Sequence, residues 1–110
     1  MSLGKYKLDA QGEPIPEPDL MTWAEWIETA DRQVARDRIG NVEVSTVFLG
    51  LDHNYSGRGD PILWETMVFG GPMNYDMTRC GGSREQAEAM HQKMVAKVQA
   101  EMKVETSNPS

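Results

Sequence analysis

The loop formed by residues 52–61 holds the residue types best suited to chemistry, and their order first suggests a metal site. Asp52-x-Asn54-x-Ser56-Gly57 matches the opening of an EF-hand calcium loop. The twelfth position of such a loop needs a bidentate glutamate, and this chain has Leu63 there. Sequence typical of strands, not helices, flanks the loop. We therefore expect no metal.

Acid–base catalysis is the second possibility, because Asp52, His53 and Glu65 lie close together in the sequence. A histidine acts as a general base when a carboxylate orients it. Asp52 and His53 are adjacent at the end of a strand, however, so their side chains diverge. Cys80 has no histidine placed to activate it. We expect no enzyme and no catalytic residue, with a small hydrolase built on Asp52, His53 and Glu65 as an alternative.

Anion binding is the third possibility, and it depends on glycines and arginines. Arg58 lies between two glycines, which leave the neighbouring backbone N–H groups accessible. Residues 81–83 (GGS) precede the last helix, whose N-terminus offers free amides and a positive dipole. Ser83, with Arg79 and Arg84 close by, is therefore a candidate phosphate site. The candidate stacking surfaces for a base are the aromatic residues Phe48, Tyr55, Trp64 and Phe69.

A helix is predicted before this region, over residues 22–31. Thr22 and Glu25 have the spacing of a capping box, which predicts that the helix begins at Thr22. Trp23 and Trp26 share one face of it and are expected in the core. A stacking platform for a flat ligand is the alternative role for one of them.

The N-terminal residues 1–20 are predicted to form an extended arm. Prolines alternate with other residues there, and each proline favours extended backbone at itself and at its predecessor. The arm is either a flexible tail or a segment that lies on the domain or on a second subunit.

Four strands and a second helix follow the first helix. The strands are predicted at residues 33–38, 42–51, 62–69 and 75–80. Ser83 and Gln86 form a second capping box, and apolar residues at helical spacing continue to about residue 103. We predict one two-layer α+β domain over residues 21–103, in which two helices cover one face of a four-stranded antiparallel sheet. Residues 104–110 are predicted to be a flexible tail.

Composition narrows the function classes. The chain has 110 residues, one cysteine and a net charge of −6. Long nucleic acid is not an expected partner, because it requires a basic face. The sequence contains neither a membrane-length apolar segment nor the apolar segment of a signal peptide, so we expect a cytoplasmic protein with no membrane partner. The two central strands are apolar on both faces, which predicts a homodimer or a higher homo-oligomer.

Three segments carry a resemblance to a known family: VSTVFLGLDHN, ILWETMVFGG and AEAMHQKMV. Together they resemble small phage and prophage proteins, and the strand–loop–strand block resembles the Thoeris anti-defence sponge family. That resemblance implies a non-catalytic oligomer that captures cyclic ADP-ribose-type signals or cyclic oligonucleotides at subunit boundaries. It implies that Phe69 and Asn54 contact the base and that Arg79 contacts phosphate. The last helix does not match the family's pair of arginines, and His91 is a candidate group on that helix.

We therefore expect a phage-encoded, non-enzymatic protein that sequesters a small cyclic-nucleotide or cyclic ADP-ribose-type immune signal in a bacterial host, without a cofactor. The alternative is a protein-interaction module that inhibits a host protein or serves as a minor phage component. Any ligand site is expected where the loop of residues 52–61 meets the GGS turn. The expected ligand-binding residues are Phe48, Asn54, Arg58, Phe69, Arg79, Ser83, Arg84 and His91.

Overall fold

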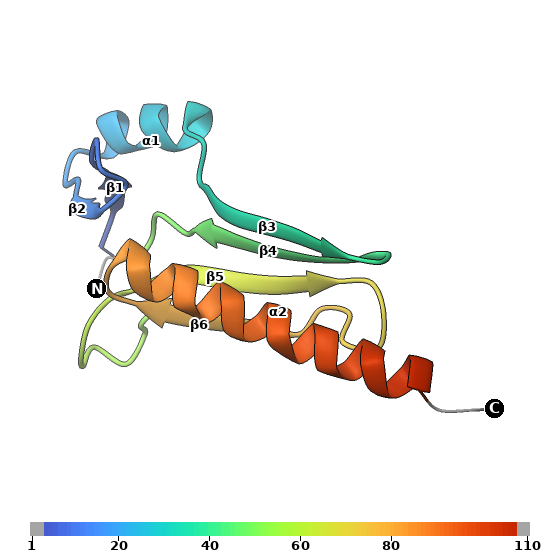
Figure 1. Ribbon diagram of the computed structural model, residues 1–110. Coiled ribbons are helices and arrows are strands. Elements are labelled where there is room, and N and C mark those ends of the chain that lie inside the picture. Colours follow the sequence, from blue (N-terminus) through green and yellow to red (C-terminus); the bar gives the residue numbers. More distant parts are fainter. Residues whose placement is uncertain (1–3, 108–110) are drawn as a thin grey trace.

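The computed structural model describes residues 4–107, and it describes side chains for residues 4–102. In chain order the elements are β1 (Tyr6–Leu8), β2 (Pro14–Pro16), α1 (Leu20–Thr29), β3 (Gln33–Ile39), β4 (Val42–Phe48), β5 (Ile62–Phe69), β6 (Met77–Gly81) and α2 (Arg84–Ser107). The predicted α+β class and the four-stranded antiparallel sheet are confirmed (Figure 1). None of the helices in the described part of the chain is long and apolar enough to cross a membrane.

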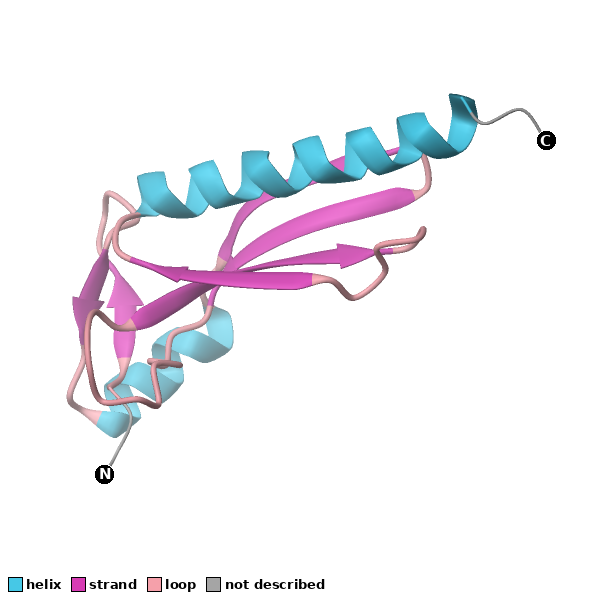
Figure 2. Cartoon of the chain, turned by 90° about the horizontal axis from the view of Figure 1, so that it is seen from below, coloured by secondary structure: helices cyan, strands magenta, loops and turns pink. Residues whose placement is uncertain are grey.

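The main sheet has the strand order β3-β4-β5-β6, and α2 lies along one of its faces in contact with all four strands (Figure 2). Residues in β4 alternate strictly between buried and half-buried positions, because successive strand residues point to opposite faces. The buried positions of β4 pair with those of β5, as Val44 with Val68 and Phe48 with Trp64. Two apolar clusters result, one around Val44 and one around Phe48.

The predicted capping box at the start of α2 is confirmed. The Ser83 amide donates to the Gln86 side-chain oxygen over 2.8 Å, and the Gln86 amide donates to Ser83 Oγ over 3.4 Å. The helix continues to Ser107, so the backbone of residues 104–107 is helical and not a tail as predicted. The rest of the predicted tail, residues 108–110, lies outside the described residues.

The position of α1 differs from the prediction that both helices cover one face. Figures 1 and 2 show α1 at one end of the main sheet, on the side away from α2. The Trp23 Nε1–H donates to the carbonyl oxygens of Tyr6 and Gly50, both over 3.1 Å. Gly50 has a φ of 81°, and a Cβ atom there would come within 2.3 Å of Ile27 Cδ1. The apolar stripe of α1 therefore packs on the end of β4 and on β1.

The described part of the N-terminal segment is a hairpin and not one extended arm, and it lies on the domain, which was one of the two alternatives for the arm. β1 and β2 form a two-stranded antiparallel sheet. The Asp9 carboxylate closes its turn by accepting hydrogen bonds from the Gln11 and Glu13 amides, each over 2.9 Å. The Tyr6 amide donates to the Gly50 carbonyl oxygen over 2.8 Å, which ties the hairpin to the end of the main sheet.

The start of α1 also differs from the prediction, because Asp19 and not Thr22 is the N-cap. The Asp19 carboxylate accepts a hydrogen bond from the Thr22 amide over 2.8 Å. The hydrogen bonds from the Thr22 hydroxyl and then from its amide lower the pKa of Asp19 below its usual value. Thr22 is thus a donor to the cap.

We expect an Asp19→Ala variant to unfold at a lower temperature than the wild type at pH 7, and the difference to shrink at about pH 3. The folded-state pKa of Asp19 is lowered, so its stabilising contribution is present at neutral pH and is lost as pH falls through that pKa. Thermal unfolding at both pH values measures the effect. Asp19→Asn keeps a capping oxygen that does not titrate and is the control. Equal differences at both pH values would show that Asp19 is not a charged cap.

Candidate functional site

Two of the eight predicted ligand residues, Phe48 and His91, lie in the core. Neither side chain has any exposed surface. The Phe48 ring packs against Trp26 and Trp64, at centroid distances of 5.9 and 5.0 Å. The prediction that Phe48 and His91 contact a ligand is therefore wrong. Phe48 lies on the sheet face that α2 covers, and His91 lies on the side of α2 that packs against that face.

His91 instead belongs to a hydrogen-bonded chain of four side chains. Its Nε2 lies 2.7 Å from Asp37 Oδ2, and its Nδ1 lies 2.7 Å from Thr46 Oγ1. Thr46 Oγ1 lies 2.5 Å from Thr66 Oγ1. A neutral ring that donates Nε2–H to Asp37 and accepts at Nδ1 from the Thr46 hydroxyl satisfies every member, with Thr66 donating to Thr46. Only Asp37 reaches solvent, so the buried hydroxyls serve structure and not attack on a substrate.

The loop of residues 52–61 is held by hydrogen bonds within the loop. Asn54, one of the predicted ligand-binding residues, makes several of them. The side-chain nitrogen of Asn54, Nδ2, donates to the carbonyl oxygens of Arg58 and Asp60, over 2.6 and 2.8 Å. Its side-chain oxygen accepts from the Ser56 amide and hydroxyl. Asn54 therefore organises the loop, and the prediction that it reads a base finds no support in these contacts. Arg58 lies exposed on the loop.

This loop and the GGS turn meet, as expected. A Cβ atom at Gly81 would come within 2.3 Å of the Pro61 carbonyl oxygen, so only glycine permits this approach. The cleft beside the contact is acidic rather than basic, since Glu13 and Asp60 line it. The Glu13 carboxylate also accepts a hydrogen bond from the Arg84 amide over 2.8 Å at the start of α2. The predicted phosphate site at Ser83 is thus occupied by a carboxylate of the chain itself.

Phe69 and Arg79 lie on the face of the main sheet opposite α2, at different positions along it. The strand register pairs Arg79 with Glu65, and the two side chains form an ion pair of 2.9 Å. Phe69 lies four residues after Glu65 along β5, which is about 13 Å in a strand. The centroid of its ring lies 6.3 Å from that of Tyr75, and the two rings are nearly perpendicular. Asn54 precedes the start of β5, whereas Phe69 ends it. Within one chain, the three residues that the resemblance pairs with a ligand do not converge.

The residues of the hydrolase alternative do not converge either. The Asp52 carboxylate accepts hydrogen bonds from the Asn54 and Ile62 amides, over 2.7 and 2.9 Å. His53 Nδ1 lies 2.8 Å from the Leu51 carbonyl oxygen, to which it donates, and Glu65 is paired with Arg79. Burial raises the pKa of the Cys80 thiol, which makes it a poor nucleophile at neutral pH. Among the residues described, no three histidine, cysteine or acidic side chains are grouped to hold a metal ion.

The predicted Arg84 lines a larger cleft, which we name the Arg84 cleft. It has a volume of about 590 Å³ and lies between the β1–β2 turn, the end of α1 and the start of α2. The Arg84 guanidinium lies against Gly12, where a Cβ atom would come within 2.9 Å of Nη1. Its ion pair with Glu88 is long, at 3.5 Å from Nε to the carboxylate. The other residues that line the cleft are Leu8, Asp9, Ala10, Gln11, Trp26, Ala30 and Asp31.

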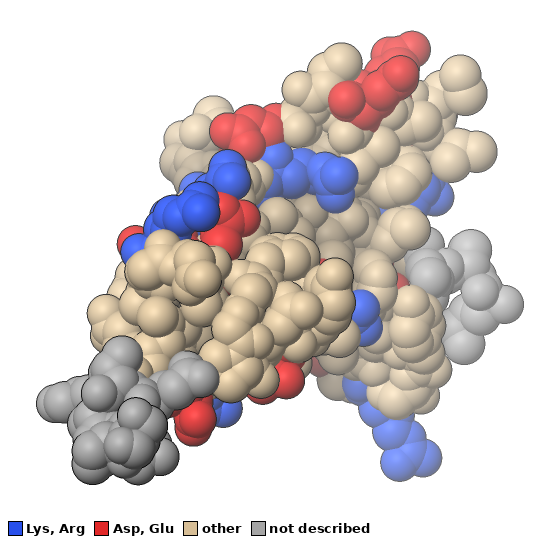
Figure 3. Space-filling model, turned by 90° about the vertical axis from the view of Figure 1, so that its right-hand side faces the viewer, with Lys and Arg blue, Asp and Glu red and all other residues tan. Residues whose placement is uncertain are grey.

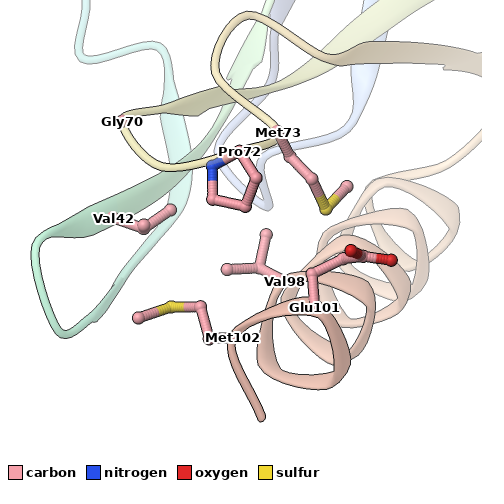
Figure 4. A pocket seen from close by; sticks show the side chains of 7 residues that line it. All are labelled: Val42, Gly70, Pro72, Met73, Val98, Glu101 and Met102. Atoms are coloured by element: carbon pink, nitrogen blue, oxygen red, sulfur yellow. The ribbon is translucent and has the colours of Figure 1, made fainter. Parts of the chain in front are cut away.

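A third depression, at the far end of α2, is a packing seam. Figure 4 shows Val42, Val98 and Met102 gathered around it, with Pro72 and Met73 of the β5–β6 loop on its other side. It has no room for a water molecule. The β5–β6 loop therefore closes the core at this end and forms no ligand site.

Sequence reasoning missed the contributions of Glu13, Asp9 and Asp31 to the region around Arg84. Their positions depend on the docked hairpin. The alternating prolines had instead led to the prediction of an extended arm. The Asp-x-x-Gly turn signal at Asp9 could have indicated that hairpin. Comparison of the chain with protein-family models, curated proteins and solved structures finds no match in any of the three.

Proposed function

We propose that this protein binds a small nucleotide-type molecule in the Arg84 cleft and does not convert it chemically. The observation that carries the proposal is that Arg84 of α2 and Trp26 of α1 line one surface cleft. A guanidinium binds phosphate through a fork of N–H donors, and an indole supports a base. The volume of the cleft lies in the range usual for small-molecule sites.

The charge of the cleft limits the ligand. Asp9 and Asp31 also line it, and each already accepts backbone hydrogen bonds at its Oδ1 atom. Their remaining acceptor capacity suits ribose hydroxyls or an amino group of a base. One arginine beside two carboxylates favours a ligand with one phosphate group over a ligand with several, because each further phosphate would meet like charge.

Sequestration is the use of such a site that agrees with the resemblance to the anti-defence sponge family. It requires binding without conversion, and the two carboxylates of the Arg84 cleft, Asp9 and Asp31, each hold a backbone amide through Oδ1. We therefore propose capture of a cyclic-nucleotide-type signal as the function.

Isothermal titration calorimetry with cyclic mononucleotides, cyclic ADP-ribose isomers and cyclic dinucleotides tests the proposal. We expect heat with at least one ligand, and an affinity at least about tenfold lower for Arg84→Ala, because a charge-assisted contact is lost. Arg58→Ala removes an exposed arginine outside the cleft and is the matched control. Absence of heat with all of these ligands, or equal weakening by both variants, would overturn the proposal.

A further inference from the structure

The face of the main sheet opposite α2, which we name the open face, has no covering layer within residues 4–107, which the structure describes. α1 approaches that side only toward one end of the sheet (Figure 2). The apolar centre of the open face comes from three strands, β4, β5 and β6. Its members are Val47, Met67, Phe69 and Met77.

Met67, Phe69 and Met77 are neighbours and are partly solvent-exposed. Val47 lies diagonally across from Met67, because its direct partner is Glu65. Met67 is directly opposite Met77 in the β5–β6 register, and Phe69 is the next residue on the same face of β5. Phe69 and Met77 are 40% and 44% exposed. Methionine adapts its shape to a surface that packs against it, so this centre suits a protein contact better than a small ligand. No cleft described above lies on this face.

Four of the five charged side chains around the apolar centre are paired within the chain. Arg36 and Glu43 form an ion pair of 2.8 Å, and Arg79 and Glu65 form one of 2.9 Å. With Arg38, the open face carries a net charge of +1 on a chain of net charge −6. Figure 3, a view of the end that carries the β3–β4 turn, shows basic and acidic groups side by side on part of the surface at that end. The strongly acidic remainder of the molecule repels a second copy more strongly than the single net positive charge of the open face does.

We propose that the open face binds the open face of a second copy of this chain. A two-fold contact brings like groups together near its axis, so a face on which the charges other than Arg38 are internally paired is suited to self-contact. Four strands at ~4.8 Å spacing and ~23 Å length offer about 450 Å² from each copy. Twice this area falls in the range of weak interfaces, so the expected dimer has a dissociation constant in the micromolar range and exchanges with monomer.

Sedimentation velocity over about 1–300 µM protein tests the proposal. We expect the wild type to shift from monomer to dimer across this range, and Met77→Glu to weaken the dimer at least about tenfold by placing a charge in the apolar centre. Met21→Glu is the matched control, because Met21 is 66% exposed on α1 and lies outside the open face. Circular dichroism and thermal unfolding of both variants verify that each is folded.

Amide chemical shifts followed on dilution locate the interface. We expect the shifts that change with concentration to belong to β4, β5 and β6 and not to the exposed side of α2. A wild type that stays monomeric at about 300 µM would overturn the proposal and leave the open face to a different protein. A dimer that persists unchanged in Met77→Glu, or whose shifts map to α2, would overturn it as well.

Discussion

Replacing Phe48 with alanine will lower the free energy of unfolding by about 3–5 kcal/mol, the usual cost of removing a fully buried phenylalanine ring. The ring has no exposed surface and lies between Trp26 of α1 and Trp64 of β5. Its loss therefore leaves a cavity where α1 and the main sheet meet. Urea denaturation followed by tryptophan fluorescence and by circular dichroism measures the change.

Phe69→Ala is the matched control, because it removes the same side chain from the open face. Phe69 is 40% exposed and has one described ring neighbour, Tyr75. We expect it to cost about 1 kcal/mol or less. If Phe48 were a ligand residue and not a core residue, the two variants would have similar stability, and only ligand binding would separate them. Equal stability of the two variants would thus contradict the assignment of Phe48 to the core.

The strands and the last helix could be predicted because their signals are local. Residues 62–69 form β5 as predicted, since a run of apolar and β-branched residues ends at Gly70. The predicted 42–51 strand ends earlier, at Phe48, because the left-handed Gly50 turns the chain toward the hairpin. The predicted 75–80 strand begins later, at Met77, because Tyr75 has a φ of 70° in the preceding turn. The observed strand boundaries therefore differ from the predicted ones where a turn or a tertiary contact competes with strand propensity.

The arrangement of the N-terminal third could not be predicted, because it depends on contacts distant in sequence. Trp23 is fixed by the Gly50 carbonyl oxygen, 27 residues away, and Glu13 binds the Arg84 amide from 71 residues away. The prolines of residues 14–18 do favour extended backbone, as expected. Extended backbone is equally compatible with a free arm and with β2, so local reasoning had no means to choose between them.

The residues of the candidate site were predicted from their types, without knowledge of the side chains that pair with them in the fold. Arginines and glycines were predicted as groups suited to anions, but two of these groups have partners that the sequence does not reveal. Arg79 is neutralised by Glu65 across a strand pair, and the helix N-terminus by Glu13. Arg84 lines a cleft, and its ion pair with Glu88 is longer than the other two arginine–glutamate pairs described above, at 3.5 Å from Nε to the carboxylate. A site prediction from sequence therefore needs the pairing of charges, which only the fold supplies.

Replacing His91 with leucine will lower the free energy of unfolding by about 1–3 kcal/mol. The partners of His91 in the core, like those of the arginines, are supplied by the fold. The helical stripe of α2 predicts an apolar residue near this position, yet the structure buries an imidazole there. The leucine side chain provides no acceptor, so one hydroxyl proton of the Thr46–Thr66 pair is left without a partner in a site closed to water. Asp37 is half exposed and regains solvation when the ring is lost.

The triple variant His91→Leu, Thr46→Val, Thr66→Val distinguishes this explanation from a simple loss of packing. Replacing all partners of a buried network by apolar groups of similar shape is nearly neutral, so we expect the triple variant to recover at least about half of the loss. Asp37→Asn keeps an oxygen that accepts from the ring and is the mild control. Urea denaturation of the four proteins at one pH gives the comparison. A triple variant less stable than His91→Leu alone would show that the hydroxyls stabilise the fold without the imidazole, and that the four side chains do not act as one chain.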